Sequence, residues 1–269
     1  MHTLVCVKQV PDTTEIKMDS KTNTLDRSSA PTIINPYDEH AVEEAVKIKK
    51  EFGGRVSIIS MGPPQAKDVI KKCIEMGADE GYLLSDRAFA GSDTLATSYI
   101  IAMGIKKIME FEPIDLVFCG KQAIDGDTAQ VGPGIACRLG IPQLTYVEKI
   151  NSLDIENNTV VIHRKIDNGY EVVQSQLPCL ITIEKSINEL SFSPLQNMIK
   201  AARYKPIVWG INDFKANLSQ IGLKGSPTSV RRIFPPQQRA GGELLKGNAD
   251  QIVKTLVDKL KGGIIQWQF

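Results

Sequence analysis

The chain has 269 residues, of which 42% are hydrophobic, enough to bury one large core or two small ones, and this composition excludes a disordered protein. Its 32 Lys and Arg residues balance 31 Asp and Glu residues, so the total charge does not favour a nucleic-acid-binding or membrane-surface protein. Five scattered cysteines and three distant histidines form neither a disulfide pattern nor a metal-binding motif, which fits a reducing, intracellular setting.

No apolar stretch approaches the roughly 18 to 20 residues that a membrane span needs. The run over residues 3–10 is strand-like, is interrupted by Lys8 and is followed by Pro11, unlike a signal peptide. We therefore expect a cytoplasmic protein without membrane insertion.

Strand and helix patterns alternate through the first half of the chain. The predicted elements are a strand at 4–7, a hairpin-like stretch at 12–27, a helix from Asn35 to Gly53, a strand at 56–61, a helix at 64–76, a strand at 82–84, a helix from about Ser92, and a strand at 115–119. Asn35 is suited to cap the first helix, and Pro36 suits its first turn. The helix from Ser92 carries Leu95, Tyr99, Ala102 and Met103 at helical spacing, which predicts an inward stripe.

The pattern changes after Pro142. Successive strands are predicted at 145–153, 159–166, 170–175 and 180–183, and we interpret them as an antiparallel extension. The fold class is therefore α/β, with a doubly wound, mainly parallel sheet, this extension and a loop-rich C-terminal arm. We predict a nucleotide-binding domain over 1–190 and a partner-recognition segment over 191–269.

The C-terminal segment has a charge of its own. Residues 200–246 contain nine basic and two acidic residues, a net charge of +7, which leaves 23 basic against 29 acidic residues elsewhere. Such a segment is either a solvated surface or an arm that docks on another subunit; its length and loop-rich composition favour the arm.

One glycine-rich loop, residues 119–134, follows a predicted buried strand and precedes a helix. Small residues and a helix start suit a phosphate, and Thr128 and Gln130 can add hydrogen bonds, although a plain connection explains the glycines equally well. The loop is neither a Walker A motif nor a Rossmann fingerprint. The loops at 7–12, 35–38 and 60–63 should converge on the same sheet edge, and 90–94 offers another helix start. Each loop alone fits a plain cap or turn, but together they would line a crevice large enough for a nucleotide.

These residues resemble the beta subunit of electron-transfer flavoproteins along nearly the whole chain. The most specific match is GKQAID at 120–125. The other matching segments are VKQVPD at 7–12, NPYD at 35–38, MGAD at 76–79, LQNMIKA at 195–201 and PQQR at 236–239.

The resemblance implies an adenine-nucleotide-binding α/β fold and a set of cofactor-binding residues. They are Cys6, Lys8, Asn35, Pro36, Tyr37, Asp38, Met61, Gly120, Lys121, Gln122, Ala123, Ile124, Asp125, Gly126, Asp127, Thr128, Ala129, Gln130 and Val131, with Asp93, Thr94 and Thr97 as candidates near a flavin ring. Helix capping is the alternative role for Asp93, Thr94 and Thr97. No catalytic residue and no metal ligand is expected.

Three segments, 25–35, 86–97 and 126–133, resemble the electron-bifurcating members of the family, in which FAD occupies the site that holds a structural AMP in other members. This resemblance implies an FAD that accepts hydride from NADH. It implies electron transfer to ferredoxin or flavodoxin and, through an alpha-subunit FAD, to an acyl-CoA dehydrogenase-like partner. The alternative within the family is a subunit that holds AMP.

Leu195 aligns with the leucine by which the family anchors its partner dehydrogenase, and Lys200 and Arg203 beside it could steer an acidic partner surface. A rival of another class is an ATP-consuming enzyme of the adenine-nucleotide hydrolase type. Such enzymes usually carry a phosphate loop after the first strand, where this chain has KQVPD at 8–12.

Overall fold

The computed structural model describes residues 1–12, 17–19, 24–26, 31–228 and 243–265. The chain divides into two compact units, Met1–Arg231 and Arg232–Phe269. The second unit contains α6 (Ala249–Ile265), and Lys259 in this helix pairs with Glu243 at 2.6 Å. Residues 229–242 of the predicted docking arm at 200–246 lie outside the described residues.

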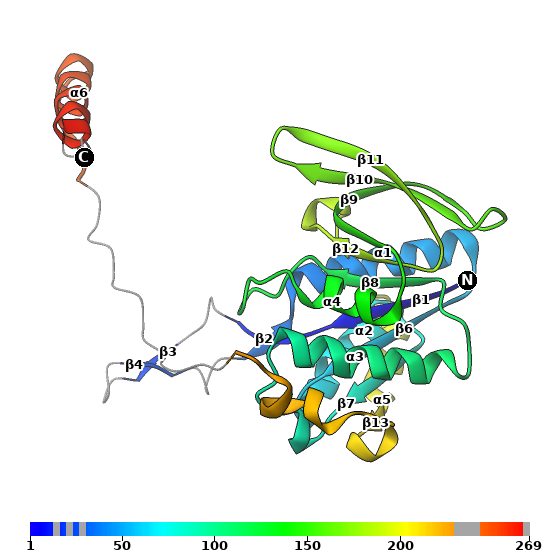
Figure 1. The fold of residues 1–269 in the computed structure, drawn as a ribbon. Coiled ribbons are helices and arrows are strands. Elements are labelled where there is room, and N and C mark those ends of the chain that lie inside the picture. Colours follow the sequence, from blue (N-terminus) through cyan, green and yellow to red (C-terminus); the bar gives the residue numbers. More distant parts are fainter. Residues whose placement is uncertain (13–16, 20–23, 27–30, 229–242, 266–269) are drawn as a thin grey trace. The chain divides into compact units, whose positions relative to one another are not determined.

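A nine-stranded mixed sheet lies at the centre of the first unit (Figure 1). In spatial order its strands are β11 (Gly169–Gln176), β10 (Thr159–Ile166), β9 (Gln143–Asp154), β12 (Cys179–Ile183), β8 (Leu116–Gly120), β1 (His2–Val7), β6 (Arg55–Met61), β7 (Glu80–Leu84) and β13 (Ile207–Trp209). The pairs from β9 to β13 are parallel, while β10 is antiparallel to both of its neighbours. This arrangement confirms the predicted fold class.

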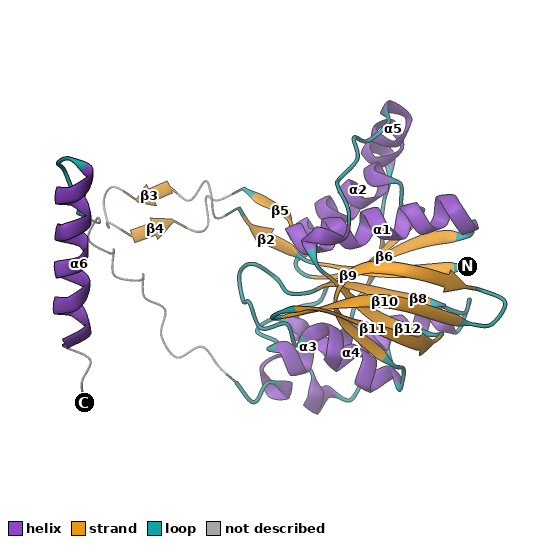
Figure 2. Ribbon diagram, turned by 90° about the horizontal axis from the view of Figure 1, so that it is seen from above, coloured by secondary structure: helices purple, strands orange, loops and turns teal. Residues whose placement is uncertain are grey.

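Helices cover both faces of the sheet (Figure 2). One face carries α1 (Pro36–Phe52), α2 (Lys67–Met76) and α5 (Leu195–Arg203), and the other carries α3 (Thr94–Met109) and α4 (Val131–Leu139). Each face has its own apolar cluster, because neighbouring residues of a strand point to opposite faces: Val5 belongs to the first cluster, Leu4 and Cys6 to the second. Among the described residues, none of the helices is both long and apolar enough to cross a membrane.

Two short antiparallel ribbons lie outside the main sheet. They are β2 (Gln9–Pro11) with β5 (Thr32–Ile34), and β3 (Lys17–Asp19) with β4 (Thr24–Asp26). The second ribbon confirms the hairpin predicted at 12–27.

Three expectations need correction. The strand pattern predicts β12 as part of the antiparallel extension, but it lies between β8 and β9 and is parallel to both. The predicted stripe of α3 is wrong by one position at its start, since Leu95 is half exposed while Ala96 and Ile100 are buried. The loop-rich segment after residue 191 also supplies β13, which pairs with β7 as the edge strand.

The direction of the chain changes beside β1. From β1 the chain passes through α1 to β6 on one side, and after β7 it returns through α3 to β8 on the other side. The loops that follow β1 and β8 therefore diverge at their carboxyl ends, which is where doubly wound sheets bind ligands.

Candidate functional site

The first turn of α1 ties together the loops that follow β1 and β8. The Asp38 carboxylate accepts the backbone N–H of Lys8 at 2.7 Å and that of Gly120 at 3.1 Å. Asn35 donates from Nδ2 to Asp38 at 2.9 Å and to the carbonyl of Gln122 at 2.8 Å. Its Oδ1 accepts the N–H of Ile124 at 3.2 Å. Asn35 holds the N-cap position as predicted, but its side chain joins the loops instead of capping the helix.

Gly120 is the position where the chain passes closest to this turn. A Cβ placed there would lie 2.2 Å from Oδ1 of Asp38 and 2.7 Å from Cβ of Tyr37. Only glycine leaves room for the bond between the Gly120 N–H and the carboxylate.

The centre of this network is buried, and its rim is exposed. Asp38 retains 6% of its accessible surface, and this burial raises the pKa of its carboxyl to about 7, although its hydrogen bonds with Asn35, Lys8 and Gly120 act in the opposite direction. At the rim, Nζ of Lys8 lies 2.7 Å from both carboxylate oxygens of Asp125. The ion pair connects the same two loops a second time.

The far end of the glycine-rich loop has the geometry of an anion site. Ala129 has a positive φ of 53°, Gln130 follows in the right-handed region, and α4 begins at Val131. Such a pair of residues points successive N–H groups into one concavity, and a helix N-terminus adds to its positive potential. Among the described residues, the N–H groups of Thr128, Ala129 and Gln130 have no backbone or side-chain acceptor. This donor set suits a phosphate group.

The first turn of α3 reaches this loop. Thr94 Oγ1 donates to Oε1 of Gln130 at 3.0 Å. Asp93 caps α3 by accepting the N–H groups of Leu95 and Ala96, which confirms the capping alternative for this residue and lowers the pKa of its carboxyl. Thr97 is half-buried in the first turn of α3, where its N–H bonds to the carbonyl of Asp93.

Asp93 also holds a distant part of the chain. Its second carboxylate oxygen accepts the N–H of Thr228 at 3.2 Å and the hydroxyl of Thr228 at 2.8 Å, and its own N–H donates to Ser226. No local pattern signals Ser226 and Thr228 as partners, because 133 or more residues separate them from Asp93.

The remaining predicted residues flank this network. Cys6 and Cys119 face each other on β1 and β8 with buried side chains, and Met61 is half-buried at the end of β6. Tyr37 lies under the ammonium groups of Lys121 and Lys185, at 6.0 and 4.6 Å from its ring centre.

Glu184 is a residue that the sequence reasoning missed. It is 6% exposed and pairs with Nζ of Lys121 at 2.9 Å, which raises the pKa of that lysine. A charged residue directly after the buried strand β12 was the available signal.

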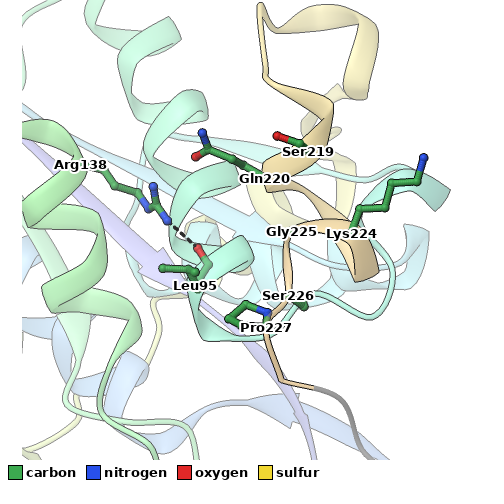
Figure 3. A pocket seen from close by; sticks show the side chains of 8 residues that line it. All are labelled: Leu95, Arg138, Ser219, Gln220, Lys224, Gly225, Ser226 and Pro227. Atoms are coloured by element: carbon green, nitrogen blue, oxygen red, sulfur yellow. Dashed lines mark hydrogen bonds between the residues drawn. The ribbon is translucent and has the colours of Figure 1, made fainter.

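A pocket of about 370 Å³ lies beside the start of α3 (Figure 3). Arg138 lines it, and its guanidinium donates to the carbonyl of Leu95 at 3.1 Å and to the hydroxyl of Ser98 at 3.2 Å. Lys224, on the opposite wall, extends away from Arg138. The remaining lining residues are Leu95, Ser219, Gln220 and residues 225–227, and none of the predicted cofactor-binding residues is among those that line the pocket. Within the described ranges, His, Cys, Asp and Glu side chains form no cluster able to hold a metal ion.

Leu195, the predicted anchor for a partner protein, is the first residue of α5 and is 66% exposed. The fully exposed ring of Phe192 precedes it, and Met198 and Ile199 follow with about half of their surface exposed. The segment before it is fixed, since Ser191 donates to Glu43 at 2.7 Å and Asn188 to Glu44 at 3.0 Å.

The fold defines a doubly wound α/β protein, and these loops lie at its topological switch point, where proteins of this class bind ligands. Residues 22–209 match the electron transfer flavoprotein domain. The chain is 47% identical over 262 residues to protein FixA of Bradyrhizobium diazoefficiens, covering 97% of this chain and 91% of the relative. It is also 47% identical to the caffeyl-CoA reductase-Etf complex subunit CarD of Acetobacterium woodii and to the electron transfer flavoprotein subunit beta of Megasphaera elsdenii, each covering 97% of this chain and 98% of the relative.

These similarities extend over both units of the chain. The chain belongs to the beta-subunit family of electron transfer flavoproteins.

Proposed function

We propose that this chain is the FAD-binding beta subunit of an electron-bifurcating electron transfer flavoprotein. The ADP part of the FAD would lie against the loop at 120–131, with its phosphates at the N–H groups of 128–130. The contact between Thr94 and Gln130 carries the proposal, because the first residue of α3 lies beside that loop, where a ligand longer than AMP would contact both.

When bound, FAD would supply a ring that takes hydride from NADH and passes electrons to ferredoxin or flavodoxin and, through an alpha-subunit FAD, to an acyl-CoA dehydrogenase-like enzyme. The chain's own residues would bind and orient the FAD. Asn35 and Asp38 fix the two loops, the backbone N–H groups at 128–130 would donate to the phosphates, and Thr94 at the N-terminus of α3 would lie toward the ring.

Partner binding is the second part of the proposal. One relative is named as a subunit of a caffeyl-CoA reductase-Etf complex, and other relatives are named as beta subunits. Their names support pairing with an alpha subunit and contact with an acyl-CoA-dependent flavoenzyme. Leu195 has the exposure of an anchor for that enzyme, and the basic segment at 200–246 would contact the alpha subunit.

The nucleotide content of the purified heterodimer tests this function. Two FAD molecules per heterodimer, with NADH-dependent reduction, are the expected result. One FAD with one AMP would contradict bifurcation and indicate a subunit that takes part in simple electron transfer. ATP turnover by the isolated chain would favour the hydrolase alternative.

A further inference from the structure

Asp38 lies in the first turn of a helix but does not face solvent. Its carboxylate is 6% exposed and accepts three hydrogen bonds, from the N–H groups of Lys8 and Gly120 and from the side chain of Asn35. Two of these donors are backbone groups of different loops, one on each side of the switch point. The carboxylate thus spans the gap at which the ligand loops diverge.

Attraction to the helix dipole does not explain this arrangement. Glu39 carries a carboxyl group in the same turn, yet within the described part of the chain it has no hydrogen bond to either loop. A buried carboxylate is costly unless donors surround it, and here each oxygen is satisfied by a different loop.

The neighbouring residues extend the connection. Asn35, which donates to Asp38, also bonds to the backbone of Gln122 and Ile124. These two side chains therefore fix the position of residues 120–124 relative to Lys8. Glycine at position 120 is consistent with this role, because a Cβ there would collide with the carboxylate.

We propose that Asp38 is a positioning residue of the nucleotide site, whose carboxylate sets the spacing between the loop after β1 and the loop after β8. This role differs from the direct nucleotide contact that the family resemblance implied. It rests on the proposed function only in taking a nucleotide as the ligand of these loops.

Hydrogen–deuterium exchange of the purified heterodimer tests the positioning role directly. In Asp38→Ala and Asp38→Asn, the amides of Lys8 and Gly120 should exchange about tenfold faster, as expected for the loss of one charge-assisted hydrogen bond. Amides inside the strands, such as those of Val5 and Phe118, should keep their protection. Glu39→Gln is the matched control, because it changes a carboxyl group in the same helix turn that, within the described residues, has no hydrogen bond to either loop.

The same variants report on the ligand. Release of the bound nucleotide should be about tenfold faster in both Asp38 variants and unchanged in Glu39→Gln. Asp38→Asn preserves the side-chain shape, so it answers the question if Asp38→Ala does not fold.

Unchanged exchange at Lys8 and Gly120 would overturn the proposal. So would faster exchange with unchanged nucleotide release, or equal effects in Glu39→Gln. A wild-type heterodimer that contains no nucleotide in this subunit would refute the proposed function, while the exchange at the two amides would still decide whether Asp38 holds the loops together.

Discussion

The carboxyl edge of the sheet at β1 and β8 and the segment at 188–203 are both held by buried polar side chains, but they present opposite surfaces. At the sheet edge, Asp38 and Asn35 bond to two loops, and the rim presents the Lys8–Asp125 ion pair and the backbone N–H groups of residues 128–130. At 188–203, Glu43 and Glu44 fix the chain while Phe192 and Leu195 point outward. The first surface suits a phosphate-bearing ligand, and the second suits an apolar pocket on another protein.

The largest expected effect is the change in folding stability with pH that the carboxyl group of Asp38 causes at the sheet edge. Its folded pKa of about 7 lies above the ordinary value of 3.8, so its contribution to stability is complete below about pH 4 and is lost as the pH rises through about 7. The shift corresponds to at most about 4 kcal/mol. Urea denaturation between pH 4 and 8 should show this decline in the wild type and a flatter profile in Asp38→Asn. Glu51→Gln, on an exposed part of α1, should keep the wild-type profile.

Substitutions at two glycines of the same loop distinguish an effect on packing from an effect on ligand binding. Gly120→Val should lower the free energy of unfolding by about 3 kcal/mol, because its side chain would overlap Asp38 and Tyr37. A Cβ at position 126 would have no atom within 4 Å, so Gly126→Val should change stability by less than about 0.5 kcal/mol. It should nevertheless reduce nucleotide occupancy, measured by extraction. Full occupancy in Gly126→Val would show that this part of the loop is only a connection.

Leu195→Ala tests the apolar surface. It should weaken electron transfer to the dehydrogenase partner about tenfold or more, as for an interface anchor, and leave NADH-dependent flavin reduction unchanged. Leu218→Ala is the matched control, since Leu218 is 63% exposed in a different segment. Equal loss of both activities in Leu195→Ala would contradict the anchor role.

The smallest effect is expected at the rim of the sheet-edge site. Lys8→Gln removes the ion pair with Asp125, whose members are partly exposed, so thermal unfolding should report a loss below about 1 kcal/mol. The effect on nucleotide release should be smaller than that of Asp38→Asn. A larger effect would place the main connection between the loops at the rim.

Much of this architecture was predictable from local patterns. Asn35, Pro36 and Gly53 marked the ends of α1, and the buried runs marked β1, β6 and β8, because caps and apolar periodicity act within a few residues. The glycine-rich loop also lies at the carboxyl edge, as predicted.

Other features were out of reach of local patterns. Strand β12 continues the antiparallel strands in sequence, yet it pairs in parallel with β8, because its side chains are buried on both faces of the sheet. Leu95 fits a helical stripe but lies at the surface, since α3 is turned so that Ala96 and Ile100 face the core.

The sequence by itself determined the order of the elements, the two-faced core and the glycine-rich loop, since these depend on residue type and spacing along the chain. Only the tertiary structure decided what Asn35, Asp38 and Asp93 do. Each is a helix-start residue with the same local alternatives, and each has at least one partner that lies 82 or more residues away. For Asn35 and Asp38, those partners come within reach only when the sheet brings the ends of β1 and β8 side by side.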